Sequence, residues 1–230
     1  MKASIVIPAY NEERYIGRTL DSITKQSYDN YEIIVVDCFS EDKTAKIAES
    51  YGVKLLQFYK GNIGATRRAG ALIARGDVIV SASADIYYPS YWLEKLLEPL
   101  KDDFDGSYGS IYLLDAERHE EVSARFINKV VTPTLKKFSI PYGTGDNIAL
   151  KRDFYNHIGG FKKLETAEDL DLLKRAFENG RMAYVEEARA YSDPRRIREW
   201  GSLKYLAFHT HNFLLYNLLG KYKKDYEVVR

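Results

Sequence analysis

Residues 4–13 read SIVIPAYNEE, and residues 33–44 read IIVVDCFSEDKT. Both stretches begin as a short apolar run and turn polar within a few residues. Such runs, rich in β-branched residues, are typical of buried strands that end at a loop. Between them, residues 14–26 place apolar side chains at helical spacing. A strand, a helix and a strand in this order predict that the two strands pair in parallel.

The alternation of strand and helix continues through the first 81 residues. We predict strands at 4–8, 31–37, 53–58 and 77–81, and helices at 14–26, 44–51 and 63–74. This rhythm predicts an α/β fold with a mostly parallel central sheet flanked by helices. Ligands bind such sheets at the carboxyl ends of the strands, so residues 8–12, 37–42 and 83–85 should converge.

The second half of the chain gives weaker signals. We predict a helix from Trp92 that ends at Pro99, strands at 107–113 and 147–151, a helix at 120–131 stopped by Pro133, and a helix at 167–179 closed by Gly180. Residues 115–142 are the least regular part, and we interpret them as an insert. No internal repeat or low-complexity linker divides the chain.

The composition narrows the class of protein. A chain of 230 residues suffices for one α/β domain with a short appendage. Lysine and arginine number 34 against 33 acidic residues, so there is no basic excess, and we do not expect a nucleic-acid partner. The single Cys38 has no partner for an internal disulfide, and residues 1–10 read as a strand and not as a signal peptide. These features favour a cytoplasmic protein.

The end of the chain differs in composition. Residues 205–220 contain no Asp, Glu, Lys or Arg, but this stretch is shorter than the ~20 apolar residues of a membrane-spanning helix. Polar residues at 209–212 interrupt the apolar stripe on every side. Three interpretations of the tail stay open: docking on the domain, a dimer contact, and a membrane-surface contact through residues 203–219. The oligomeric state is not predicted.

Two aspartates directly follow predicted strands. Asp85 comes after an apolar strand, where a carboxylate suits a hard metal ion held against a diphosphate. A role in a turn or at a helix N-cap is the alternative for Asp85. Asp37 closes an earlier strand, ahead of the capping candidates Ser40 and Asp42. It is placed to accept hydrogen bonds from a ribose or a base.

Two further features lie near the starts of helices. Arg67 and Arg68 follow a glycine-containing turn, where a helix N-terminus suits phosphate, although solvated arginines are equally expected. Glu168 and Asp169 begin a helix whose dipole favours acids for stability alone. A carboxylate there also suits a general base, and we expect the dipole and the neighbours to keep it ionised.

Taken in order, these blocks resemble family 2 glycosyltransferases. The opening motifs SIVIPAYNEE and IIVVDCFSEDKT are followed by RRAG at 67–70, SAD at 83–85, IGGF at 158–161 and EDLD at 168–171. They stand in the order of the family from residue 4 to residue 171, so the similarity does not depend on any single block.

The resemblance implies a GT-A fold, a nucleoside-diphosphate sugar donor, a divalent cation (Mn²⁺ or Mg²⁺) and inversion at the anomeric carbon. It implies these roles: Pro8, Tyr10 and Glu12 beside the nucleoside, Asp37 at the base or ribose, Arg67 near the base or diphosphate, Ser83 and Ala84 beside Asp85, Asp85 at the metal-diphosphate unit, and Asp169 as the base that deprotonates the acceptor hydroxyl. We expect UDP before GDP, and a glycan or lipid-linked acceptor that faces residues 115–142. The enzyme would work in the cytoplasm or at the cytoplasmic face of the membrane.

Two positions depart from the family pattern. Ser83 stands where many members have the first aspartate of Asp-x-Asp, so Asp85 is left as the carboxylate of this element and a lower metal affinity is expected. Arg68 stands where many members have asparagine. Near the end, Arg195 and Arg196 resemble a segment that covers the diphosphate and would stabilise the leaving nucleotide. A solvated basic turn or a contact with anionic lipid is the alternative.

The resemblance also implies a division of the chain. A GT-A domain at 1–195 would consist of a nucleotide-binding half at 1–90 and an acceptor-binding half at 91–195, followed by the helical tail at 196–230. The alternative to an enzyme is a non-catalytic partner subunit that binds a nucleotide sugar with the same fold. A nucleotidyltransferase would need a glycine-rich basic loop after the first strand, and residues 8–12 do not supply one.

Overall fold

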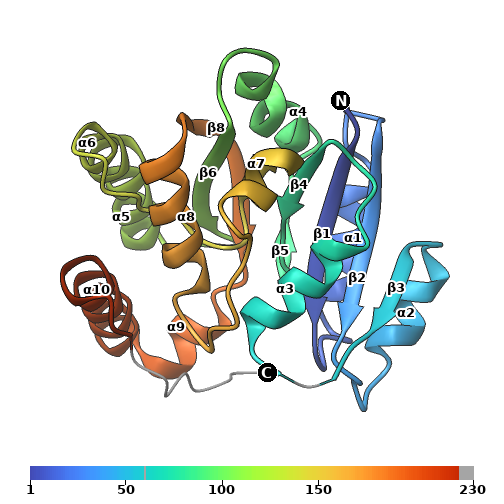
Figure 1. The fold of residues 1–230 in the computed structure, drawn as a ribbon. Coiled ribbons are helices and arrows are strands. Elements are labelled where there is room, and N and C mark those ends of the chain that lie inside the picture. The colour runs from blue at the N-terminus through green and yellow to red at the C-terminus, as the bar shows by residue number, and fades with distance from the viewer. Residues whose placement is uncertain (60, 223–230) are drawn as a thin grey trace.

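An eight-stranded sheet runs through the centre of the protein, with helices against both of its faces (Figure 1). The structure is a computed structural model, and it describes residues 1–59 and 61–222. The strands are β1 Ala3–Ala9, β2 Tyr31–Asp37, β3 Lys54–Gln57, β4 Val78–Ser81, β5 Ile86–Tyr87, β6 Gly106–Leu113, β7 Ile148–Lys151 and β8 Met182–Ser192. Their order in the sheet is β3-β2-β1-β4-β7-β6-β8-β5.

Two sets of helices enclose the sheet. One face packs against α1 Ile16–Ile23, α2 Thr44–Ser50 and α4 Trp92–Leu97, and the other against α3 Ile63–Leu72, α7 Arg152–His157 and α8 Glu168–Asn179. The remaining helical segments are the 3₁₀ turn Glu98–Lys101, α5 Arg118–Phe126, the π turn Ile127–Val131, α6 Thr132–Lys137, α9 Arg195–Trp200 and α10 Ser202–Leu219.

The first half of the sheet is parallel. β1 pairs in parallel with β2 and with β4, and β2 pairs in parallel with β3. Along β1, Ile5 and Ile7 pack into the core on one face while Val6 packs into the core on the other. Burial of both faces is the reason that these strands read as continuous apolar runs in the sequence.

The second half of the sheet is mixed. β7 is antiparallel to β4 and β6, β5 is antiparallel to β8, and β6 is parallel to β8. Parallel pairings therefore outnumber antiparallel ones, which confirms the mostly parallel α/β sheet expected from the sequence. β8 was not predicted because its middle, around Glu186 and Glu187, is polar and only partly buried. The register of β6 and β8 also shifts between Gly109 and Ser110.

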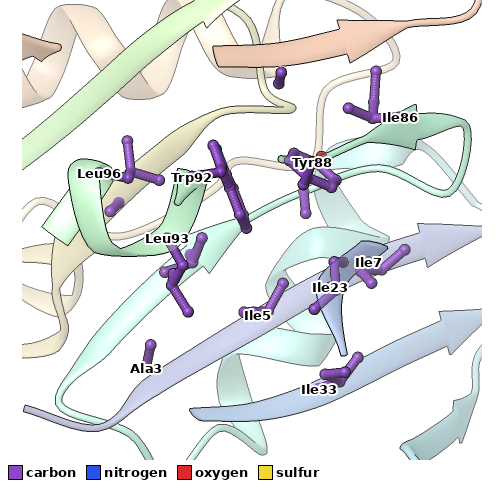
Figure 2. Close-up of a cluster of buried hydrophobic side chains, with 14 of the residues drawn as sticks. Ala3, Ile5, Ile7, Ile23, Ile33, Ile86, Tyr88, Trp92, Leu93 and Leu96 are labelled. Atoms are coloured by element: carbon purple, nitrogen blue, oxygen red, sulfur yellow. The ribbon is translucent and has the colours of Figure 1, made fainter. Parts of the chain in front are cut away.

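Buried side chains of β1 and α4 pack together in one core (Figure 2). The rings of Tyr88 and Trp92 lie with their centroids 4.0 Å apart. Trp92 donates from Nε1 to Asn147 Oδ1 at 2.8 Å, and Tyr88 donates from its hydroxyl to the carbonyl of Asp146 at 2.9 Å. Two buried aromatic side chains thus hold the loop that precedes β7.

The helix predicted at 120–131 is present, but the predicted stop at Pro133 is wrong. α5 begins at Arg118, where Glu117 and Glu120 form a capping box, and the chain stays helical to Lys137. A π turn precedes the proline, and the Thr132 N–H bonds to the carbonyl of Ile127. Pro133 comes just after this π turn and has no N–H to donate, and the carbonyl of Asn128 in the turn instead accepts a hydrogen bond from the Tyr184 hydroxyl at 2.8 Å.

The C-terminal tail docks on the domain. Tyr216 of α10 donates to Asp171 of α8 at 2.7 Å, and the ring centroids of Phe213 and Tyr142 are 5.4 Å apart. Asn212 is buried in the same helix. Of the three interpretations of the tail, the structure therefore supports docking. Among the described residues, no helix has the length and apolar character that crossing a membrane requires.

Candidate active site

Three strand ends meet at one guanidinium group. Glu12 follows β1, Asp85 follows β4, and Arg195 begins α9 after β8. Nη1 and Nη2 of Arg195 each donate to the Glu12 carboxylate at 3.0 Å, and Nη2 also donates to Asp85 Oδ2 at 3.0 Å. The guanidinium lies over the ring of Tyr15, 4.1 Å from its centroid. The predicted convergence of residues 8–12 and 83–85 is therefore present.

This contact is largely shielded from solvent. The side chains of Arg195, Glu12 and Asp85 are 11%, 15% and 23% exposed. Burial raises the pKa of the Asp85 carboxyl; Arg195 opposes this shift, and the negative charge of Asp146 adds to it. Burial also acts to lower the pKa of Arg195, but its hydrogen bonds and charge interactions with the two carboxylates outweigh this effect. Arg195 is thus a firmly charged cation placed against Asp85.

The loops after β1 and β2 are joined by side-chain hydrogen bonds. The N–H of Asn11 donates to Ser40 Oγ at 2.9 Å, and the N–H of Glu12 donates to Thr44 Oγ1 at 2.7 Å. Asn11 has a φ of 54°, a left-handed conformation that asparagine adopts more readily than most residues. These contacts fix the backbone from which the Glu12 carboxylate reaches Arg195.

Asp37 is fully buried at the end of β2. Ser40 donates its N–H to Asp37 Oδ2 at 3.1 Å and its hydroxyl to Asp37 Oδ1. This turn accounts for both carboxylate oxygens, so the base or ribose contact of Asp37 stays a prediction. Pro8 is buried in β1, and the half-buried Tyr10 follows it at the same edge of the sheet.

Arg67 is turned into the protein and is 3% exposed. Its Nη1 donates to Ser81 Oγ at 2.6 Å and to the carbonyl of Ala82 at 2.7 Å. Its Nη2 donates to Ser83 Oγ and to Asp146 Oδ1, each at 3.1 Å. Arg67 thus lies beneath the carboxyl end of β4 and supports the residues there.

The neighbour of Arg67 has a different environment. Arg68 donates from Nη1 to the carbonyls of Gly159 at 2.8 Å and Phe161 at 3.3 Å. Both carbonyls belong to the IGGF turn. The arginine at this position therefore serves the local turn, which explains its presence without a phosphate contact.

Asp146 is the acidic residue of the site that sequence reasoning missed. It lies just before β7, and its Oδ1 accepts hydrogen bonds from the Ser83 hydroxyl and from Arg67. Its backbone carbonyl accepts from Tyr88, so both its side chain and its main chain are held. The one available signal was its place in GTGDN at 143–147, directly ahead of a strand.

Glu168 and Asp169 begin α8 beside the same loop. The N–H of Gly145 donates to Asp169 Oδ2 at 3.0 Å, and Arg67 Nε lies 3.5 Å from Glu168 Oε1. Burial raises the pKa of Asp169, and the hydrogen bonds from Gly145 and Leu170 only partly oppose this shift. Burial thus opposes the effect expected of the helix dipole and the neighbours, and the ionisation of Asp169 stays a prediction. Burial and the adjacent charge of Asp169 raise the pKa of Glu168 to about 8.

The docked tail adds side chains to the same region. Burial lowers the pKa of His209 to about 4, and the positive charge of Arg196 acts in the same direction. Burial raises the pKa of Tyr205 to about 12. The charge of Asp146 acts on both groups, so α10 lies close to the loop before β7. The sequence placed these residues in the tail but not at the site.

Comparison with known proteins identifies a family. The profile of glycosyl transferase family 2 matches residues 4–159. An uncharacterized glycosyltransferase of Rickettsia conorii is 30% identical over 189 residues, which are 76% of this chain and 31% of that protein. The putative glycosyltransferase EpsE of Bacillus subtilis is 29% identical over 81% of this chain and 71% of its own length. The chain spans less than a third of the length of the Rickettsia relatives that it matches.

Solved structures share the fold at low sequence identity. S. aureus TarS 1-349 in complex with UDP superposes with a TM-score of 0.65 at 22% identity, over 86% of this chain and 63% of that chain. The mannosyltransferase PcManGT of Pyrobaculum calidifontis, in complex with GDP-Man and Mn²⁺, gives 0.65 at 19% identity, over 83% and 56% of the two chains. From the profile match and this common architecture, the chain belongs to glycosyl transferase family 2 and has a GT-A fold.

Proposed function

We propose that the chain is an inverting glycosyltransferase that moves a sugar from a nucleoside-diphosphate sugar to a hydroxyl acceptor. The observation that carries this proposal is the meeting of Glu12, Asp85 and Arg195 at the carboxyl edge of the sheet. This edge is where open α/β sheets bind ligands, and Asp146 in the loop before β7 and Asp169 at the start of α8 lie beside it. In our proposal residues 1–90 bind the nucleotide, residues 91–195 bind the acceptor, and residues 196–230 form the tail.

The donor would bind across the strand ends. Pro8, Tyr10 and Asp37 would border the nucleoside, and Arg195 and Arg196 would face the diphosphate, where guanidinium groups suit its charge. For the base we propose uridine before guanosine. TarS was solved with UDP and with UDP-GlcNAc, and PcManGT with GDP-Man, so both nucleotides are bound by proteins of this fold.

A divalent cation fits Asp85. No cluster of three or more metal-ligating side chains occurs within residues 1–59 and 61–222, which excludes an all-protein cage there. Mn²⁺ and Mg²⁺ that are bound together with a nucleotide need fewer protein ligands. One or two carboxylates suffice, because waters and phosphate oxygens complete the coordination of the cation. Asp85 Oδ2 now faces Arg195, so the charge of Asp85 is balanced by a side chain that can turn to the phosphates. When bound, the cation would neutralise the charge of the departing diphosphate.

Asp169 is the proposed general base. Gly145 holds its Oδ2 by a backbone hydrogen bond, and the N–H of Leu170 bonds to Oδ1. The acceptor hydroxyl would give its proton to Asp169 as its oxygen bonds to the anomeric carbon. The bond from that carbon to the diphosphate oxygen would break in line, and the nucleoside diphosphate would leave with the electron pair.

For the acceptor we propose a glycan or a lipid-linked sugar that faces residues 115–142. Apolar side chains remain exposed in this part, including Phe126 at 59% and Phe138 at 73%. In α10, Leu214 and Leu219 are also exposed although the helix is docked. A cytoplasmic enzyme that touches the membrane peripherally through α10 would place these side chains toward the lipid.

Calorimetric titration tests the donor site. Purified protein is titrated with UDP and with GDP, each with and without Mn²⁺, and the series is repeated with Asp85→Ala. We expect metal-dependent binding of one nucleotide that disappears in the variant. Binding without turnover on any sugar nucleotide would support the non-catalytic partner subunit, and no binding of either nucleotide would overturn the proposal.

A further inference from the structure

The segment at 83–85, which resembles an Asp-x-Asp element, carries one carboxylate and not two. Ser83 stands at its first position, and in the turn after β4 the carboxylate that remains is Asp85. A serine hydroxyl is a weaker ligand for a hard cation than a carboxylate, because it carries no negative charge. The element therefore needs another source of charge to hold a cation as firmly as two aspartates would.

The structure brings a carboxylate to this position from elsewhere in the chain. The hydroxyl of Ser83 donates directly to Oδ1 of Asp146, which lies 63 positions later in the sequence. Ser83 and Asp85 are separated by one residue, so Asp146 arrives on the same turn as Asp85. The two carboxylates repel each other, and the negative charge of Asp146 is one of the causes that raise the pKa of Asp85.

We propose that Asp146 replaces the missing aspartate and joins Asp85 in holding the divalent cation of the donor. This inference rests on the proposed function. Within the part of the chain that the structure describes, Arg67 and Ser83 donate to Oδ1 of Asp146, which leaves Oδ2 for a ligand, and the side chain is 29% exposed. A cation between Asp146 and Asp85 would relieve their repulsion.

Hydrogen bonds hold Asp146 in place, as the side chain of a metal ligand requires. Tyr88 holds its carbonyl, Arg67 and Ser83 fix Oδ1, and the preceding Gly145 is tied to Asp169. Ligands held by such surrounding hydrogen bonds keep their direction, and loss of such support costs 10–100-fold in metal affinity in other proteins. A role only as partner of Arg67 would leave the exposure of the Asp146 side chain unexplained, because Arg67 also donates to Ser81 Oγ and to the carbonyl of Ala82.

The test measures cation binding and not only activity. Asp146→Asn keeps the acceptor oxygen for Ser83 and Arg67 but removes the charge. Binding of Mn²⁺ in the presence of UDP or GDP is followed by the loss of the free Mn²⁺ spin-resonance signal. We expect Asp146→Asn to weaken Mn²⁺ binding at least ~10-fold, the lower end of what lost metal support costs. Asp103→Asn is the matched control and should bind as the wild type does, because its side chain is 90% exposed and the residues around it contact Lys151, which pairs with the amino end of β4 and not with the end that carries Asp85.

A double variant that moves the carboxylate from position 146 to position 83 tests the inference more strictly than the single variant does. Ser83→Asp combined with Asp146→Asn returns the carboxylate to the first position of the element and should recover Mn²⁺ affinity. If Asp146→Asn does not fold, Asp146→Glu keeps the charge but displaces it, and it should weaken Mn²⁺ binding while leaving metal-free nucleotide binding unchanged.

The outcomes separate the inference from the proposed function. If the wild type binds Mn²⁺ with nucleotide and Asp85→Asn does not, the donor site stands. Unchanged Mn²⁺ affinity in a folded Asp146→Asn then overturns the role of Asp146 alone. If Asp146→Asn loses turnover but keeps Mn²⁺ affinity, Asp146 acts on the acceptor and the inference is wrong. If the wild type binds no Mn²⁺ with either nucleotide, both proposals are wrong.

Discussion

Arg195 donates hydrogen bonds from both of its terminal nitrogens to the carboxylate of Glu12, a residue 183 positions earlier in the chain. The same guanidinium bonds to Asp85, so the last helical segments are held to the first strand through the proposed donor site. A side chain in this position can respond to the ligand, because a nucleotide and a cation would bring both a competing positive charge and new negative charge to it.

Replacing Arg195 should therefore lower the catalytic rate strongly and the stability of the folded protein only moderately. We expect Arg195→Met to lower kcat about 10²-fold, the loss typical of one stabilising donor. It should destabilise the protein by about 2 kcal/mol, because two partly buried carboxylates lose their partner. Arg198→Met is the control, since Arg198 lies in the same helix but is exposed. Steady-state kinetics and thermal unfolding measure the two effects; equal kcat in both variants would contradict the role of Arg195.

Asp169→Asn should separate binding from transfer. The amide keeps the shape of the side chain and an oxygen for the Gly145 N–H, but it cannot take a proton. We expect kcat to fall about 10²–10⁴-fold while the Kd of the donor nucleotide changes less than about twofold. Initial rates and calorimetry check this, and near-normal turnover would eliminate Asp169 as the base.

The pH dependence of kcat/KM should reflect the ionisation of the two buried acids at the start of α8. A base acts when deprotonated, and burial raises the pKa of Asp169, so kcat/KM should fall with acidity at a higher pH than an exposed aspartate would give. Glu168, with a pKa of about 8, holds a proton at neutral pH and ionises above it. Glu168→Gln should remove any change of rate near pH 8 and leave an acidic limb. An acidic limb that is absent down to pH 4 would contradict the raised pKa of Asp169.

Acidification should destabilise the protein through His209. The pKa of His209 is about 4 in the folded chain and ordinarily about 6.5, so the unfolded state takes up its proton first as the pH falls. Stability is complete above pH 6.5 and declines toward pH 4 by up to about 3 kcal/mol. His209→Gln should flatten this slope in denaturant unfolding, and the exposed His119→Gln should not. The same slope in all three proteins would show that other groups cause it.

Removal of residues 203–230 tests the tail. Because α10 covers Tyr142 and bonds to Asp171, we expect the shortened protein to lose solubility. Tyr216→Phe removes one hydrogen bond and should cost only about 1 kcal/mol. Sedimentation with anionic vesicles compares both with the full chain; a soluble truncated protein that no longer binds vesicles would favour the membrane contact over docking.

The sequence predicted the parallel half of the sheet well because its strands are buried on both faces. β2 runs over Tyr31–Asp37 as expected, and α3 begins at Ile63 as expected. Prediction failed where the local pattern is weak. β8 has a polar, half-buried middle, and the two-residue β5 is too short for any period to appear.

The local pattern alone predicted which residues converge only where a residue follows a strand. Asp85 and Glu12 do, and the topology of parallel strands brings such positions together. Asp146 precedes a strand that runs in the opposite direction, so its arrival beside Ser83 depends on the antiparallel pairing of β4 and β7. The raised pKa of Asp169 depends on burial by distant segments, which no local pattern reveals.

The buried guanidinium of Arg67 bears on how the chain acquires its structure. Arg67 belongs to the first 90 residues and is buried, whereas its acidic partners Asp146 and Glu168 come from the second half. A fragment that ended near residue 90 would hold an arginine inside its core with no carboxylate to balance it, at a cost of several kcal/mol. We therefore expect that the proposed nucleotide-binding half (1–90) and acceptor-binding half (91–195) do not fold separately. The chain should unfold in a single cooperative step.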